Sequence, residues 1–327
     1  MALFGNTPGN AANADSLDQQ FGKIYARLLN PSTRSKAYAE LDKIYMQYPE
    51  AAIVLGQYFQ QNDKKRAQMY FKVAADAGIA EGQWGFANTF PHSHVPDMNN
   101  ANDKAWVTYS LAAAEGGCAD AANEMGNICN RKGCYAESMY WYGMAYTLDH
   151  QSGMAGMQGI TQKWMQNGSP KEYKAFTENY TEDRHQTALL LFRMFERFDK
   201  ELVDELMALM LGGENLAGFI LGKLFEQSNN DEMTYTVYNA TAFENHPHAL
   251  RCYADLLAQG KGCEKDIPAA MRIYQQAAEK GEPSAMFMMG EAARGEKNMP
   301  LAAAWYGKAY SRGMEAAGVR LSQMIKN

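Results

Sequence analysis

The sequence predicts an all-α fold in which antiparallel helix pairs stack one after another. The first observation behind this prediction is a repeated order of residue types. The segment 273–295 contains, in this order, an aromatic residue, an alanine pair, a glycine, a short gap, an alanine and an apolar residue. The segment 302–323 repeats this order. Such self-similarity indicates one supersecondary unit copied along the chain.

The second observation is that the period of this repeat changes only in a loop. Ala249 and Ala285 are 36 residues apart, whereas Ala285 and Ala317 are 32 residues apart. The shorter unit lacks four residues of the loop that occupies positions 260–266 in the longer one. Stacked helix pairs tolerate insertions there because each pair contacts only its neighbours.

The third observation is that the same frame recurs upstream. Four earlier segments repeat the same four features, namely a leading small residue, a Leu-Gly or similar pair, an aromatic pair and a second small pair. These segments are 51–78, 82–116, 121–146 and 217–242. No such unit buries its apolar face alone, so the repetition itself predicts a stacked array.

Each unit is expected to hold two helices. In the first helix, the leading alanine, a leucine and a tyrosine-type position are four residues apart and share one face, and a small residue beside them allows another helix to approach closely. The second helix carries the aromatic pair and the alanine pair. It is followed by a glycine that suits the left-handed conformation after a helix end. These closing glycines are Gly78, Gly116, Gly281 and Gly313.

The unit that begins at Ala249 resembles the Sel-one-like repeat, a relative of the tetratricopeptide repeat. It matches nine of the fifteen fixed positions of that pattern: Ala249, Gly260, Gly262, Asp266, Ala270, Tyr274, Ala277, Ala278 and Gly281. The resemblance covers 51–323 and is weaker over 159–213. It implies a right-handed α/α superhelical solenoid whose concave face binds a protein or a peptide.

We therefore expect one helical-repeat domain over 17–327, preceded by a flexible leader over 1–16. Its expected parts are an initial pair at 17–49, repeats at 50–158, degenerate repeats at 159–213, repeats at 214–313 and a capping helix at 314–327. Within the degenerate part, two apolar helical runs meet near Phe198, and Ser169 and Pro170 predict a helix start for the segment 169–180. The alternative is two repeat blocks hinged near Gly168 or Asp183.

Composition disfavours several classes of partner. The net charge is -6, and the densest basic cluster, Lys64–Arg66, is short, whereas nucleic-acid binding needs a concentrated basic stripe. No run of about 18 apolar residues predicts membrane insertion, and the N-terminal segment lacks the features of a secretory signal, so we expect a cytoplasmic protein. Five cysteines at irregular spacing do not predict a disulfide framework.

The sequence contains no motif that predicts catalysis. Nucleophile-elbow, phosphate-loop, dinucleotide and zinc-protease patterns are absent from it, so we expect a non-enzymatic protein without a cofactor. The alternative is a metal sensor or metal-dependent hydrolase centred on His92 and His94, because histidines with a nearby Asp97 are of the type that ligates zinc. A third possibility is a module that only associates with itself.

The candidate partner-binding residues form a stripe on the first helix of each pair. One position follows the small residue and is polar, and the other lies three residues before the small residue, so the two are four apart on one helical face. This face points away from the predicted core, and its mixture of aromatic, arginine and polar side chains is typical of interaction hot spots. The residues of this stripe are Trp84, Phe219, Phe287, Arg251, Asn123, Gln57, Asn127, Lys223, Asp255 and Glu291.

Overall fold

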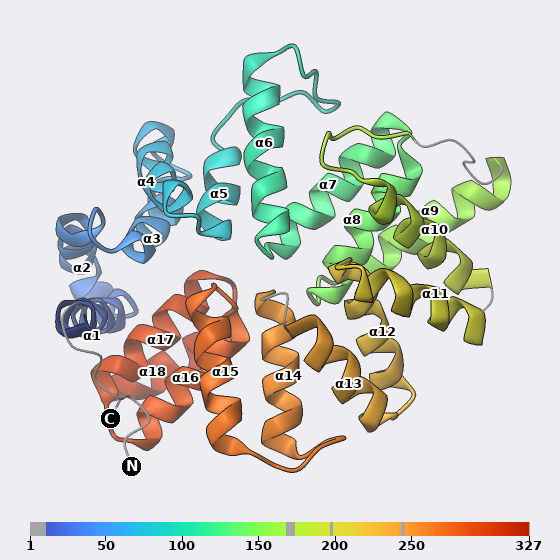
Figure 1. Cartoon of the computed structure of the whole chain (residues 1–327). Helices are drawn as coiled ribbons and strands as arrows, with labels where there is room; N and C mark the ends of the chain where they lie inside the picture. The colour runs from blue at the N-terminus through green and yellow to red at the C-terminus, as the bar shows by residue number, and fades with distance from the viewer. Residues whose placement is uncertain (1–10, 168–173, 197–198, 243–245, 327) are drawn as a thin grey trace. The chain divides into compact units, whose positions relative to one another are not determined.

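The computed structural model describes residues 11–167, 174–196, 199–242 and 246–326, and the structural statements below refer to these. Over these ranges the chain forms eighteen α-helices and no β-strand (Figure 1). Consecutive helices pack against each other as antiparallel pairs, for example α3 (Pro49–Phe59) with α4 (Lys64–Asp76) and α7 (Ala119–Lys132) with α8 (Tyr135–Thr147). The prediction of an all-α fold of paired helices is confirmed.

The chain divides into two compact units, and the first contains both ends of the chain. Unit 1 comprises Met1–Gly85 and Ala277–Asn327, and unit 2 comprises Phe86–Gln276. Besides α3 and α4, the helices of unit 1 are α1 (Ala11–Leu28), α2 (Pro31–Ile44), α5 (Ala80–Ala87), α16 (Pro283–Gly295), α17 (Met299–Ser311) and α18 (Glu315–Lys326). Helix α5 extends two residues beyond the boundary of unit 1. Helix α1 begins at Ala11, inside the segment expected to be a leader.

Unit 2 contains the remaining helices. Besides α7 and α8, they are α6 (Ala101–Glu115), α9 (Gly153–Asn167), α10 (Glu182–Glu196), α11 (Lys200–Leu211), α12 (Asn215–Gln227), α13 (Asp231–Ala242), α14 (Pro247–Gln259) and α15 (Ile267–Glu279), whose last three residues belong to unit 1. The five cysteines are free thiols; Cys118, Cys129, Cys134 and Cys252 are buried, and Cys263 is half-buried.

Polar side chains mark the start of many helices. Asn30, Asp63, Asn100 and Asn298 each accept a hydrogen bond from a backbone N–H of the first turn, which satisfies a donor that has no partner inside the helix. The sequence therefore specifies where these helices begin.

Glycines end the second helices, with one shift from the expected positions. Gly78, Gly281 and Gly313 have positive φ angles, as predicted from the repeat pattern. At the end of α6, however, Gly116 has a φ of -76° and still belongs to the helix end, and Gly117 takes the left-handed conformation with a φ of 94°. The adjacent glycine allows the helix to continue for one more residue before the turn.

Small residues in the first helices make room for aromatic rings from the second helices. The ring of Phe71 on α4 lies against both Gly56 on α3 and Gly85 on α5. Tyr306 on α17 lies in the same way against Gly290 on α16. The space that a side chain at each of these glycines would need is thus occupied by an aromatic ring of the second helix.

The middle of the chain contains the predicted degenerate helix pair. Helices α10 and α11 flank the expected junction, and the Asp199 carboxylate accepts from Leu202 N to cap α11. The segment expected to be helical at 169–180 differs: residues 168–173 lie outside the described residues, and residues 174–181 are irregular. The buried Glu137 carboxylate on α8 accepts hydrogen bonds from the backbone N–H groups of Phe176 and Thr177, so these donors are satisfied without a helix.

Candidate functional site

Four of the ten stripe residues belong to unit 1. Gln57 on α3 is exposed, whereas Trp84 on α5, Phe287 on α16 and Glu291 on α16 are half-buried. Gln57 donates a hydrogen bond from Nε2 to the carbonyl of Ser311 at a distance of 2.8 Å. Each of these four side chains thus keeps some contact with solvent, and only Gln57 is exposed.

Glu291 is the most strongly bound of these four side chains. Its Oε1 accepts hydrogen bonds from the Tyr306 hydroxyl at 2.6 Å and from Arg320 Nε at 2.6 Å, and its Oε2 accepts from Arg294 at 2.7 Å. Burial alone would raise the pKa of Glu291, but the hydrogen bonds from Tyr306, Arg294 and Arg320 outweigh it and lower the pKa to about 2. The carboxylate is therefore charged at any physiological pH.

In unit 2 the structure brings three stripe residues together with one residue that the pattern did not identify. Lys223 on α12 forms an ion pair with Asp149, in the turn after α8. Arg251 on α14 lies 3.6 Å from the other oxygen of Asp149 and 2.8 Å from the carboxylate of Asp255. Lys223, Arg251 and Asp255 thus form one charged cluster around Asp149.

The remaining stripe residues of unit 2 differ in burial. Asn123 and Asn127 on α7 are half-buried, and Asn127 Nδ2 donates to Glu124 Oε2 at 2.8 Å. Phe219 on α12 is 0% exposed, with its ring 4.5 Å from the His246 ring and 5.9 Å from the His248 ring, measured between centroids. Its side chain belongs to the core of unit 2 and offers no surface to a partner.

A tyrosine of the second helix holds the polar stripe residue in three of the pairs. Tyr142 donates to Asn127 Oδ1 at 2.7 Å, and the hydroxyls of Tyr274 and Tyr306 donate to Asp255 and Glu291. In the α3–α4 pair the equivalent ring is Phe71, which has no hydroxyl, and Gln57 bonds elsewhere. In these three pairs, the same type of hydrogen bond therefore joins the polar stripe residue to an aromatic position of the repeat.

Sequence reasoning missed the charged partners of the stripe. Asp149 has a φ of 61°, and it is 74 residues from Lys223 in the chain, so no local pattern links the two. Arg320 on α18 is likewise 29 residues from Glu291. The recurring tyrosine was detectable, because it belongs to the aromatic pair of the repeat, although its hydroxyl contact was not.

The loop that carries His92 and His94 is ordered by other contacts. The buried Asp103 carboxylate accepts hydrogen bonds from Ser93 N and Asp97 N, both at 2.7 Å, and these contacts lower the pKa of Asp103. His92 stacks on Trp106 with 4.3 Å between ring centroids. Among the described residues, no group of three or more His, Cys, Asp or Glu side chains is placed to hold a metal ion.

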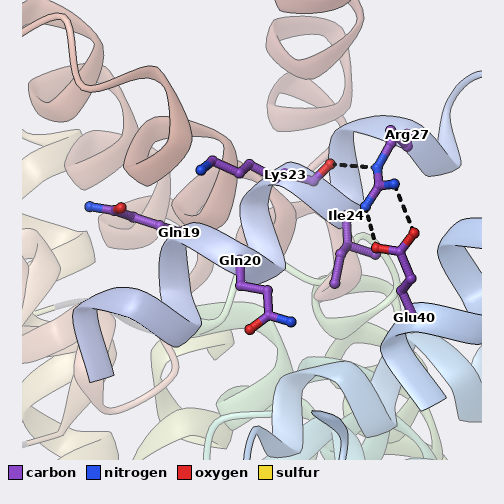
Figure 2. A pocket seen from close by; sticks show the side chains of 6 residues that line it. All are labelled: Gln19, Gln20, Lys23, Ile24, Arg27 and Glu40. Atoms are coloured by element: carbon purple, nitrogen blue, oxygen red, sulfur yellow. Dashed lines mark hydrogen bonds and ion pairs between the residues drawn. The ribbon is translucent and has the colours of Figure 1, made fainter. Parts of the chain in front are cut away.

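A polar hollow lies between α1 and α2 in unit 1 (Figure 2). Its volume is about 340 Å³, and it is lined by Gln19, Gln20, Lys23, Ile24, Arg27 and Glu40. The Arg27 guanidinium forms two hydrogen bonds with the Glu40 carboxylate, and its Nε donates to the carbonyl of Lys23 (Figure 2). Of its three charged residues, Arg27 and Glu40 neutralise each other and Lys23 remains as the third, so we assign no ligand to this hollow.

Comparisons with solved structures find two proteins to report. The chain is similar to Sel1 repeat proteins. One is a Sel1 repeat protein from Oxalobacter formigenes, with 18% identity, a TM-score of 0.39 and coverage of 99% of this chain and 86% of the other. Another is a protective antigen of uropathogenic Escherichia coli that displays an SLR fold, with 16% identity, a TM-score of 0.40 and coverage of 97% and 81%.

Two other comparisons give no match. No protein-family model matches the sequence, and no curated protein matches it. Within the described ranges, none of the helices is long and apolar enough to cross a membrane.

Proposed function

We propose that this protein is a non-catalytic scaffold that binds a protein or peptide through the stripe on the first helices of its pairs. The proposed surface consists of Gln57, Trp84, Phe287 and Glu291 in unit 1, and of Asn123, Asn127, Lys223, Arg251 and Asp255 in unit 2. Phe219 is left out because its side chain is completely buried. Stacked helical repeats suit this role, since each added pair extends a surface without changing the core.

The observation that carries the proposal is the tyrosine hydrogen bond to the polar stripe residue. Asn127, Asp255 and Glu291 are each held by the hydroxyl of a tyrosine from the second helix of their own pair. Side chains that are already ordered lose little conformational entropy when a partner binds. A surface role explains why an ordered polar group returns at the same position in several pairs.

The side chains of the stripe suit a partner that presents charged groups together with a few apolar side chains. Lys223, Arg251 and Asp255 present both signs of charge around Asp149 in unit 2. Trp84 and Phe287 add half-buried aromatic surface in unit 1. Aromatic and arginine side chains dominate the binding energy of most protein interfaces, and charged groups mainly determine which partner fits.

The experiment is affinity capture from the native lysate with the parent chain and with the double variant Trp84→Ala/Phe287→Ala. We expect the variant to lose at least about tenfold in captured partner, since each hot-spot truncation costs more than about 1 kcal/mol. A matched control is Met69→Ala/Met299→Ala, which truncates two residues on second helices, each 45% exposed. The control should capture as much partner as the parent.

Thermal unfolding of the same variants separates a surface role from a core role. Trp84→Ala/Phe287→Ala should keep the helical circular dichroism of the parent and unfold within a few degrees of it. The proposal fails if capture is unchanged, or if the variant unfolds far below the parent, because the two rings would then serve the core.

A further inference from the structure

Helix α1 packs more extensively against α17, near the other end of the chain, than against its sequence neighbour α2 (Figure 1). Both helices belong to unit 1. The apolar face of α1 is buried, with Phe21 at 0%, Ile24 at 1% and Tyr25 at 5% exposure. Only two residues, Leu29 and Asn30, connect α1 to α2. Most of the contact that holds α1 is thus made with a distant segment.

The two helices approach each other through a glycine on each side. A Cβ atom on Gly22 would lie 2.3 Å from the carbonyl oxygen of Pro300 and 2.6 Å from the backbone nitrogen of Ala304, so α1 touches the backbone of α17 directly. In return, a Cβ atom on Gly307 would lie 2.9 Å from the Tyr25 ring. The surface of α17 therefore accepts a helix with a glycine at one defined position.

A partly buried ion pair fixes the register of this contact. Asp18 on α1 lies 2.7 Å from Lys308 on α17, and the two side chains are 19% and 10% exposed. The Tyr48 hydroxyl donates to the same carboxylate, and the Lys308 ammonium lies 4.4 Å from the centre of the Trp305 ring. Ion pairs of this kind contribute more to the choice of register and partner than to stability.

Other contacts join the two ends of the chain without α1. Gln57 donates to the carbonyl of Ser311, and Arg312, whose side chain is 2% exposed, pairs with Glu81 at 3.2 Å. Helix α3 also packs against α17. Release of α1 from α17 would therefore leave the remaining helices of unit 1 attached to one another.

We infer that the face of α17 around Gly307 and Lys308 is a helix-binding site, and that α1 of a second copy of this chain can occupy it in place of the resident α1. The site recognises an acidic residue together with four residues that follow it on the same helix. An aromatic residue and a glycine stand at the third and fourth positions after the acidic residue, and an aliphatic and an aromatic residue stand at the sixth and seventh. In α1 these are Asp18, Phe21, Gly22, Ile24 and Tyr25. Rotation about Leu29 and Asn30 moves α1 between the two copies. This inference concerns a surface separate from the proposed stripe.

The test uses two full-length variants with opposite charge reversals, Asp18→Lys and Lys308→Asp. In each variant alone, α1 meets a like charge on its own α17 and binds it poorly. In a 1:1 mixture, α1 of either variant can meet an opposite charge on α17 of the other. The new lysine at position 18 of the first variant faces the new aspartate at position 308 of the second, and the unchanged Asp18 and Lys308 face each other in the reciprocal contact. We expect light scattering to give a species of twice the chain mass in the mixture and a monomer for each variant alone.

The control combines both reversals in one chain, Asp18→Lys/Lys308→Asp, which restores an opposite-charge pair within the molecule and should remain monomeric. If the mixture shows only monomers while hydrogen exchange shows α1 released in each variant, the site does not accept a second copy and the inference is overturned. If either variant fails to fold, hydrogen exchange of the parent decides. Faster exchange of α1 than of α2 supports an exchangeable helix, and equally slow exchange contradicts it.

Discussion

The ring of Tyr142 occupies the space that a side chain on Gly126 would need, since a Cβ atom there would lie 2.7 Å from Tyr142 Cδ1. The same ring also lies against Gly156, where a Cβ atom would come within 2.4 Å of it. One aromatic side chain of α8 thus lies between glycines of α7 and α9. This arrangement matches that of Phe71 between Gly56 and Gly85, and it explains why the repeat places a small residue inside its first helix.

Gly126→Ala should destabilise the protein although alanine favours helices. The alanine gains about 1 kcal/mol of helix propensity, but the added methyl group must displace the Tyr142 ring, and overpacking of this kind costs about 1–3 kcal/mol. These two effects leave a net loss of up to about 2 kcal/mol in the free energy of unfolding, measured with urea.

The matched control for this substitution is Gly159→Ala in α9. A Cβ atom on Gly159 meets no atom within 4 Å, so only the gain in helix propensity remains. The control should equal or exceed the parent in stability. Equal stability of both variants would show that the ring does not need the glycine.

The Glu291 carboxylate should make part of the stability of unit 1 depend on pH. Its pKa of about 2 in the folded protein is below its ordinary value of 4.5, so its contribution is present above pH 4.5 and is lost as the pH falls toward 2. Because the Glu291 side chain is partly exposed and water screens its partners, we expect a loss of about 1–2 kcal/mol over this range.

Glu291→Gln should remove this part of the pH dependence, whereas Glu315→Gln on the exposed surface should retain it. The measurement is the free energy of unfolding at pH values between 6 and 2.5. Parallel curves for the parent and Glu291→Gln would contradict the role of the Tyr306, Arg294 and Arg320 hydrogen bonds.

Two histidines at the start of α14 should destabilise unit 2 in mild acid. Burial lowers the pKa of His246 to about 4, and burial together with the charges of Arg251 and Lys223 lowers the pKa of His248 well below its usual range. Both groups bind protons more readily in the unfolded chain, so stability should fall as the pH drops from 6.5 toward 4. The expected loss is on the order of 2 kcal/mol.

His246→Gln/His248→Gln should flatten the pH dependence in this window, whatever its effect on stability at pH 7. His94→Gln is the control, because that side chain is exposed. Chemical unfolding at pH 7, 6, 5 and 4.5 gives the slope. An unchanged slope in the double variant would mean that other groups take up the protons.

Glu137→Gln should release the irregular segment 174–181, which lies within the degenerate part of the chain. The amide group replaces a carboxylate that accepts from Phe176 N, Thr177 N and the Thr177 hydroxyl, and buried donors left without a partner cost about 1–3 kcal/mol. Hydrogen exchange at Phe176 and Thr177 should become faster. Glu178→Gln, at an exposed neighbour, should leave this exchange unchanged, and equal effects of the two changes would contradict the role of Glu137.

The parts of the fold that the sequence predicted are those determined by local pattern. Gly56, Gly126 and Gly290 occur at fixed places in the repeat, and their partner rings follow 15, 16 and 16 residues later in the next helix. Caps such as Asp63 and Asp199 likewise act within three residues of their own position. These signals were sufficient to predict paired helices.

The features that the sequence did not predict depend on contacts between distant segments. In the irregular segment 174–181, the backbone donors of Phe176 and Thr177 bind Glu137, about 40 residues earlier in the chain. Asp149 joins the charged stripe residues of unit 2 from a turn on another helix pair. The contact between α1 and α17 links residues almost 300 positions apart, and no repeat pattern includes it.

The most direct test of the scaffold role is hydrogen exchange of the protein with and without its captured partner. The scaffold role predicts that binding slows exchange in the first helices that carry the stripe, namely α3, α5, α7, α12, α14 and α16. Slower exchange confined to second helices such as α4 and α13, with no change in those six, would contradict it.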